Sequence, residues 1–242
     1  MSDPEADMEK MSRRSFFKGA GAVAAAVAVA PGCERPAPPR PPYSFFNADE
    51  ASFVEAAVAR LIPADETGPG ALEAAVPTYL DRQLGGAWGG GERLYRSGPW
   101  QPGKPEQGYQ LRFTPAELFR AAMRAIIEDL RATNRGSFAK LPAEDQDAYL
   151  RTLERESKDL GGVPSNIFFG SLLEMTIEGF FSDPVHGGNK DMVGWKLIGF
   201  PGAYANYYEL VDQHGIAFKP PPMSLAQSAG DHAHPEPAPK RN

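Results

Sequence analysis

Cysteine is almost absent from this chain, which has a single one, Cys33, among its 242 residues. One thiol excludes an intramolecular disulfide, a zinc site built from several cysteines and the C-x-x-C-H attachment of a c-type haem. Basic residues are also in the minority, since 25 Lys plus Arg stand against 31 Asp plus Glu, a formal net charge of −6. This balance argues against nucleic acid as a partner, because nucleic-acid-binding domains present a basic patch or stripe.

A run of small apolar residues near the N-terminus is too short to cross a membrane, because a spanning helix needs roughly 20 residues. A charged segment precedes this run, and together they have the order of a signal peptide. The charged segment resembles the twin-arginine export signal, which hands folded proteins to the twin-arginine translocase. We therefore predict a signal peptide at residues 1–33 and a periplasmic location. The residues that carry the resemblance are Arg13, Arg14, Phe16, Phe17 and Lys18.

Two endings of this signal peptide stay open. Residues 28–30 read Ala-Val-Ala, which fits the A-x-A cleavage pattern and would leave a mature chain that begins at Pro31. Residues 30–33 loosely resemble a lipobox, in which case Cys33 would carry a lipid and associate the protein with the membrane.

Prolines gather in two clusters, and these bracket the part of the chain that is expected to fold. Residues 34–43 are interpreted as a Pro-rich linker and residues 220–242 as a disordered Pro-rich tail, because such polar segments have little apolar surface to bury. Between them, at residues 44–219, apolar residues recur with a helical period and we find no convincing alternating strand. The sequence predicts a single all-α domain of five or six helices.

Local signals mark the helix starts. Asn47 with Glu50, and Thr114 with Glu117, have the spacing of capping boxes, and Pro77 suits the first turn of a helix. Further helices are expected through Leu72, from Pro142 to Gly161, and over 166–181 behind a Ser165 cap.

The predicted helix at 166–181 is apolar nearly all round, so we expect it to be central and buried. The Gly-rich stretch at 85–112 is instead expected to be an ordered or semi-ordered loop. Its two tryptophans, Trp88 and Trp100, favour packing against this domain or against a partner.

The densest group of candidate functional residues lies between the predicted helix and residue 202. A hydrolase-like oxyanion hole at His186 would also need a G-x-S-x-G nucleophile elbow, which this chain lacks. A metal held by His186 with Asp183 or Asp191 would lack the paired motif of a typical metal site. The favoured interpretation is structural, with Asp183, His186 and Asn189 satisfying backbone groups in a tight turn that shapes a surface for another protein. The residues concerned are Asp183, Pro184, His186, Gly187, Gly188, Asn189, Asp191, Gly194 and Trp195.

We find no P-loop, no catalytic pair of carboxylates and no Ser/His/Asp triad. Catalytic residues, a metal site and a cofactor of its own are therefore not expected in this chain.

Three blocks together resemble the gluconate 2-dehydrogenase subunit 3 family, the small subunit of sugar and sugar-acid dehydrogenase complexes. They are the twin-arginine leader, the stretch from Leu61 through Asp81, and residues 181–202. The last block is the most specific, because its glycines and Trp195 fall where that family has them. The resemblance covers about residues 44–215.

The resemblance implies a division of labour between subunits. A large FAD-bearing subunit of the glucose-methanol-choline (GMC) oxidoreductase type would oxidise the sugar, and a multihaem cytochrome c subunit would pass electrons on. The small, non-catalytic subunit would bind the flavoprotein, carry it through the twin-arginine translocase and stay attached, associated with the membrane through its partners. The motif residues from Asp183 to Trp195 would then shape a surface that faces the partner or define the core.

Two other hypotheses remain open at this stage. A stand-alone periplasmic enzyme or metal-binding protein would use Asp183, His186 and Asp191, and it predicts bound metal and activity without a partner. A lipid-anchored structural protein depends on acylation of Cys33.

Overall fold

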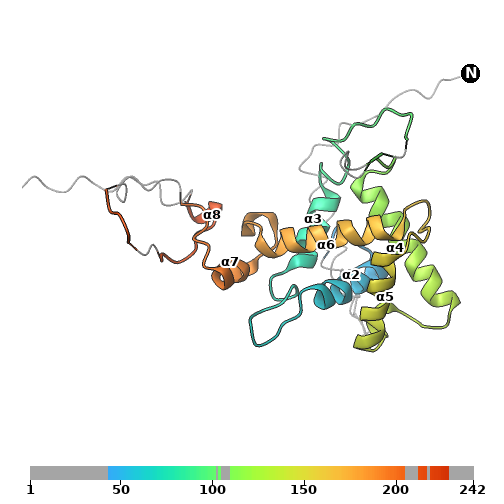
Figure 1. Cartoon of the computed structure of the whole chain (residues 1–242), viewed down its shortest axis with the longest axis horizontal. Coiled ribbons are helices and arrows are strands. Elements are labelled where there is room, and N and C mark those ends of the chain that lie inside the picture. The colour runs from blue at the N-terminus through green and yellow to red at the C-terminus, as the bar shows by residue number, and fades with distance from the viewer. Residues whose placement is uncertain (1–42, 102, 105–109, 205–211, 217–218, 229–242) are drawn as a thin grey trace, which may run out of the picture. The chain divides into compact units, whose positions relative to one another are not determined.

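The computed structural model describes residues 43–101, 103–104, 110–204, 212–216 and 219–228 (Figure 1). Within these ranges every regular element is a helix, and β-type pairing is confined to isolated bridges. The prediction of a single all-α domain is confirmed. None of the helices in the described ranges has the length and apolar character that a membrane crossing requires. The export signal and Cys33 lie outside the described residues.

Helices α2 (Ala48–Leu61) and α4 (Pro115–Ala132) begin at the capping boxes that the sequence predicts. The Asn47 side chain accepts a hydrogen bond from the backbone N–H of Glu50, and the Glu50 carboxylate accepts one from the N–H of Asn47. The same pair of bonds opens α4. Each box satisfies two backbone donors that a helix start leaves unpaired, so both boundaries follow from local sequence.

The apolar pattern of the sequence predicts some of the remaining helices and not others. Three of them were expected, and Pro77 lies in the first turn of one as predicted. The last two helices were not anticipated, because they are too short to show a period. The bounds are α3 (Val76–Gly85), α5 (Ala143–Arg155), α6 (Ser165–Phe181), α7 (Val193–Ile198) and α8 (Leu225–Ser228), with 3-10 turns η2 (Phe138–Lys140), η3 (Pro184–His186) and η4 (Lys190–Met192).

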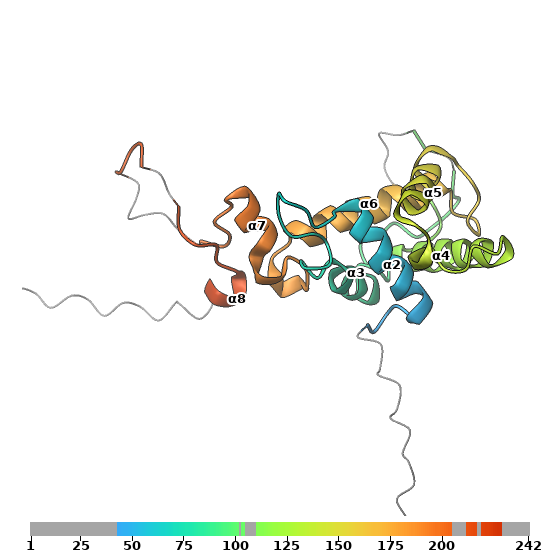
Figure 2. The ribbon, with the colours of Figure 1, turned by 90° about the horizontal axis from the view of Figure 1, so that it is seen from below.

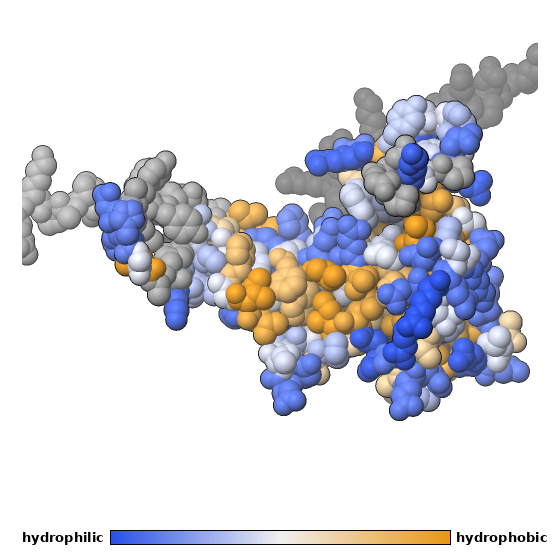
Figure 3. All heavy atoms as spheres, in the orientation of Figure 1, coloured by the Kyte–Doolittle hydropathy of each residue, from blue (hydrophilic) through white to orange (hydrophobic). Residues whose placement is uncertain are grey.

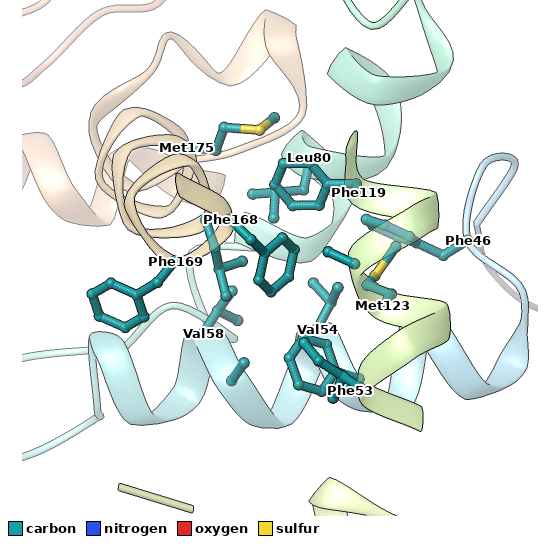
Figure 4. Packing of buried hydrophobic residues seen from close by; sticks show 14 of the residues in the cluster. Phe46, Phe53, Val54, Val58, Leu80, Phe119, Met123, Phe168, Phe169 and Met175 are labelled. Atoms are coloured by element: carbon teal, nitrogen blue, oxygen red, sulfur yellow. The ribbon is translucent and has the colours of Figure 1, made fainter. Parts of the chain in front are cut away.

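The hydrophobic core forms where α2, α3, α4 and α5 all contact α6, and α6 leads on toward α7 (Figures 1 and 2). Phe168 of α6 is fully buried, and its ring centroid lies 5.3 Å from that of Phe119 and 6.2 Å from that of Phe53 (Figure 4). Burial of one such side chain contributes about 2 to 3 kcal/mol. Four helices therefore pack against one side of α6.

Helix α6 is central, as predicted, but it is buried on one side only. Ile167, Ile177 and Phe181 are 38%, 46% and 37% exposed, respectively. The four surrounding helices cover one side of α6 only. An apolar composition on every side does not tell a fully enclosed helix from one with an uncovered apolar side.

A buried carboxylate fixes the beginning of the domain. Asp81 of α3 is 4% exposed, and its Oδ1 accepts hydrogen bonds from the N–H groups of Phe45 and Phe46 at 2.7 and 3.0 Å. Its Oδ2 accepts from the N–H and the hydroxyl of Ser44, both at 2.9 Å. Arg120 of α4 donates to the Phe45 carbonyl and lies over the Phe45 ring, 4.0 Å from its centroid. These contacts hold residues 44–46 between α3 and α4.

Helix α5 ends at Arg155, well before Gly161, where the sequence pattern places its end. The cause is Ser165, which does not cap α6 as predicted. Its hydroxyl donates to the Glu156 carbonyl at 2.7 Å and accepts from the Lys158 N–H at 3.1 Å. Because a distant side chain takes these backbone groups, the chain leaves the helix.

Residues 71–75 form turns, although a helix through Leu72 was expected. Ala71 and Ala74 are fully buried while Leu72 is 47% exposed, and Ala75 has a left-handed backbone with φ of 56°. A left-handed residue cannot continue a right-handed helix, so α3 starts anew after it.

The loop after α3 packs against this domain in part. Trp88 lines a cavity of about 240 Å³ together with Leu118 of α4 and Met175 of α6, and 42% of its surface stays exposed. The Gly89 carbonyl also accepts from the N–H of Ala116 at the start of α4.

Residues 220–228 have defined structure, although they were assigned to a disordered tail. The Met223 N–H donates to the Pro201 carbonyl at 3.0 Å, and the Met223 carbonyl accepts from the Ala203 N–H at 2.7 Å. The rest of the predicted tail, 229–242, and the linker through residue 42 lie outside the described residues.

Replacing Asp81 by Ala will leave three backbone N–H groups without their acceptor. We expect a loss of about 3 kcal/mol in the free energy of unfolding, measured by urea denaturation, because buried unpaired donors keep their full desolvation cost. Asp81→Asn retains one acceptor and will lose less. Asp145→Ala, on the exposed side of α5, is the control and should stay within about 0.5 kcal/mol of wild type. A similarly small change for Asp81→Ala would contradict the role of this carboxylate.

Acid will remove the contribution of the Arg60–Asp147 ion pair. Two hydrogen bonds from the Arg60 guanidinium, at 2.7 and 2.8 Å, hold the pKa of Asp147 below its ordinary value. Because the folded pKa is lower than the unfolded one, the stabilisation is present above about pH 4 and disappears as the pH falls through the folded pKa.

Asp147→Asn should therefore be less stable than wild type at about pH 6, and the difference should shrink toward about pH 2. Urea denaturation of both proteins at several pH values measures this difference. A difference that is independent of pH would show that the pair does not lower the pKa of Asp147.

Candidate functional site

The candidate site from the sequence follows the C-terminal end of α6, and we call residues 182–195 the motif loop. Residues 182–192 connect α6 with α7 through the short turns η3 and η4, and residues 193–195 are the beginning of α7. A helix end leaves several carbonyl groups without an intrahelical donor, and these need other partners if the end is covered. The motif loop supplies donors for these carbonyl groups.

Side chains of the motif loop donate to the carbonyls at the end of α6. The indole Nε1 of Trp195 donates to the Phe181 carbonyl at 2.7 Å, and the Asn189 amide donates to the Ser182 carbonyl at 2.9 Å. The Ser182 hydroxyl donates to the Gly179 carbonyl at 3.3 Å. Three carbonyl groups near the helix end, those of Gly179, Phe181 and Ser182, thus have side-chain donors.

Asn189 joins the end of α6 to the start of α7. It is fully buried and has a left-handed backbone with φ of 44°. While its amide nitrogen donates to Ser182, its side-chain oxygen accepts from the Gly194 N–H at 2.8 Å. The adjacent Lys190 N–H donates to the Ala74 carbonyl at 3.0 Å, which connects the loop to the turn before α3.

Two glycines allow this close approach. A Cβ atom on Gly188 would lie 2.1 Å from the Gly179 carbonyl oxygen, and one on Gly194 would lie 2.2 Å from the Phe180 carbonyl oxygen. Both contacts are with backbone, which cannot move aside as a flexible side chain can. Gly188 and Gly194 therefore serve packing against α6, and neither leaves room for a ligand between loop and helix.

Asp183 has two structural partners. One carboxylate oxygen accepts from the Val185 N–H at 3.0 Å and caps η3, in which Pro184 takes the first position. The other accepts from the Leu225 N–H of α8 at 2.8 Å. Gly187 ends η3 with a φ of 100°. Asp183 thus holds residues 220–228 against the motif loop, a contact that joins positions 42 apart in the chain.

The structure does not gather the side chains that the metal-binding hypothesis requires. His186 and Asp191 are exposed, and Asp183 is occupied by backbone donors. No group of three or more His, Cys, Asp or Glu side chains that could hold a metal ion occurs within the described ranges. The motif loop therefore contains a helix cap and a tight turn.

An uncovered apolar surface lies beside this cap. It runs over α6 and continues onto α7, where the motif loop places that helix (Figure 3). Ile198 is the most exposed of its members, at 60%. We call this surface the α6–α7 face, and its residues are Ile167, Ile177, Phe181, Leu197, Ile198 and Phe200.

A family model described as gluconate 2-dehydrogenase subunit 3 matches residues 48–202, more than half of the chain. The chain belongs to the gluconate 2-dehydrogenase subunit 3 family. The match runs from α2 through α6, the motif loop and α7, so it contains the whole candidate site. A second model, the twin-arginine translocation signal sequence, matches residues 10–30. Comparisons with curated proteins and with solved structures gave no significant match.

For this subunit 3 chain, Asp183 and Asn189 satisfy backbone groups, as the sequence interpretation expects. Asn189, Gly188, Gly194 and Trp195 are all buried, and their hydrogen bonds and packing serve the backbone of the domain. The α6–α7 face was missed. Its signal was present in α6 as apolar residues in steps of three and four, but the same helix is apolar on its buried side as well.

Asn189→Ala will leave two buried backbone groups of this subunit 3 chain without partners. We expect a loss of about 3 kcal/mol in unfolding free energy. Asn134→Ala is a matched control, since Asn134 also has a left-handed backbone, with φ of 54°, but is exposed. The control should lose about 1 kcal/mol, the cost of placing Ala in that conformation. Equal losses in the two variants would mean that the Asn189 side chain does not stabilise the cap.

Proposed function

We propose that this chain is the non-catalytic small subunit of a periplasmic, FAD-dependent sugar or sugar-acid dehydrogenase complex. Its main partner is a larger flavoprotein subunit of the GMC oxidoreductase type, which holds the FAD and oxidises the substrate. The small subunit binds the folded flavoprotein, carries it through the twin-arginine translocase, and then stabilises and docks it.

The observation that carries this proposal is the order of two sequence matches on one chain. A twin-arginine signal at residues 10–30 directly precedes a subunit 3 domain that begins at residue 48. The twin-arginine route exports proteins that are already folded, which suits a flavoprotein that receives its cofactor before export. Asn189 and Trp195 of the motif loop make their hydrogen bonds within the domain, and the uncovered apolar α6–α7 face beside the loop supports a binding role.

A multihaem cytochrome c completes the proposed complex as a third subunit and receives the electrons. With one cysteine, this chain cannot attach a c-type haem through C-x-x-C-H, so haem c belongs to that other subunit. The complex is associated with the membrane either through these partners or through a lipid on Cys33.

Replacing Arg13 and Arg14 together by Lys will test the export role. We expect the flavoprotein subunit to stay in the cytoplasm, because the translocase recognises the paired arginines of the small subunit. Cell fractionation followed by immunodetection of both subunits measures the distribution. Arg35→Lys, just after the signal peptide, is a matched control and should leave export intact. Periplasmic flavoprotein at the wild-type level in the double variant would overturn the carrier role.

A further inference from the structure

The α6–α7 face is long enough to bind another protein. Helix α6 has 17 residues and so extends about 25 Å, and α7 adds to that length. A typical protein–protein interface uses about 800 Å² on each partner, which corresponds to a patch roughly 30 Å across. Monomeric proteins seldom leave large apolar patches uncovered.

One charge lies in the middle of this face. Exposed positions of α6 follow one another in steps of three and four residues, which places them on one side of the helix. Glu174 is the central member of this stripe, midway between Ile167 and Phe181. No described residue forms an ion pair with its carboxylate. Covering the face would remove this charge from water, and that is costly unless the covering surface supplies a cation.

The neighbouring cavity has room for such a cation. Trp88, Glu174 and Glu178 line a cavity of about 240 Å³ beside α6. Glu178 already accepts a hydrogen bond from the Tyr79 hydroxyl at 3.2 Å. Burial and the Glu178 charge raise the pKa of Tyr79 to about 12, so this hydroxyl keeps its proton at neutral pH. Glu178 thus already has one donor, whereas no described residue pairs with Glu174, and an indole ring beside it favours a cationic group.

We propose that the α6–α7 face binds the flavin-bearing subunit through an apolar surface of that subunit. A Lys or Arg side chain of the partner enters the Trp88 cavity and pairs with Glu174. This assignment rests on the proposed function for the identity of the partner, while the requirement for an apolar surface with a central cation comes from the geometry of the face.

Charge distinguishes this occupant from two others. A second copy packed around a two-fold axis at the middle of α6 would bring Glu174 against its own counterpart, which is repulsive. A bilayer surface rich in anionic lipid attracts basic residues, whereas this face has a central carboxylate on a chain with a net charge of −6. A different polypeptide with a basic residue satisfies both constraints.

The test is purification of the tagged full chain from cells that produce the complex, with the bound flavin measured per chain. The larger polypeptide is identified by peptide mass spectrometry. Ile177→Asp and Glu174→Lys should each lower the flavin-to-chain ratio by about tenfold or more, and Glu174→Gln should lower it less. Ala148→Asp and Glu154→Lys make the same kinds of change at exposed positions of α5 and should leave the ratio unchanged.

Thermal unfolding of each purified chain checks that the variants fold. Should Ile177→Asp unfold early, Glu174→Lys still tests the face, because its site is exposed and unpaired. Wild-type flavin ratios in both variants would overturn the assignment of this face while leaving the proposed function intact. A wild-type chain that brings down no flavoprotein would overturn the proposed function itself.

Two further measurements test whether a second copy of this chain or a membrane binds the α6–α7 face instead. In the first, the wild-type chain alone is examined by sedimentation. A dimer that Ile177→Asp dissociates and that Glu174→Gln strengthens would assign the face to a second copy and overturn the proposal. In the second, binding of the chain to vesicles of phosphatidylglycerol and phosphatidylethanolamine is measured. Binding that Glu174→Lys strengthens would assign the α6–α7 face to the membrane and would also overturn the proposal.

Discussion

The hydrogen bonds that close the C-terminal end of α6 are the interaction on which the rest of the site depends. Trp195 and Asn189 supply donors to carbonyl groups that no intrahelical N–H can reach. Because side chains satisfy these groups, the chain can fold back over the helix end, and glycines at 188 and 194 let it do so closely. The position of α7, and with it the extent of the α6–α7 face, follows from this cap.

In the proposed complex, stability and recognition are carried by different residues. Those that mark the motif, above all Asn189 and Trp195, are buried and act within the domain. The residues available to a partner are ordinary aliphatic and aromatic side chains on the open side of α6 and on α7, together with one carboxylate, Glu174. A motif can therefore identify a family through the geometry that it maintains, while the binding surface lies beside it. This separation fits a subunit that works by association, for which surface complementarity matters more than a reactive group.

The proposed division of labour explains why so little chemistry is visible in this chain. Two of its acidic side chains, Asp81 and Asp183, accept hydrogen bonds from backbone groups and hold segments of the chain together. Residues 220–228 extend the domain beyond the family match, which ends at 202, and Asp183 attaches them to the motif loop. In the proposed complex, flavin, haem and substrate contacts belong to other subunits, and this chain contributes the export signal and the docking surface.

The sequence by itself determined what depends on near neighbours. The two capping boxes placed the starts of α2 and α4, periodicity indicated an all-α domain, and the leader and the 181–202 block identified export and family. The tertiary structure decided what depends on residues far apart. Asp81 meets residues 35 to 37 positions away, Ser165 ends α5 from the next helix, and Asp183 holds a segment that composition had assigned to a disordered tail. It also decided which side of α6 stays open, because a helix that is apolar all round has no local signal for the side that its neighbours will cover.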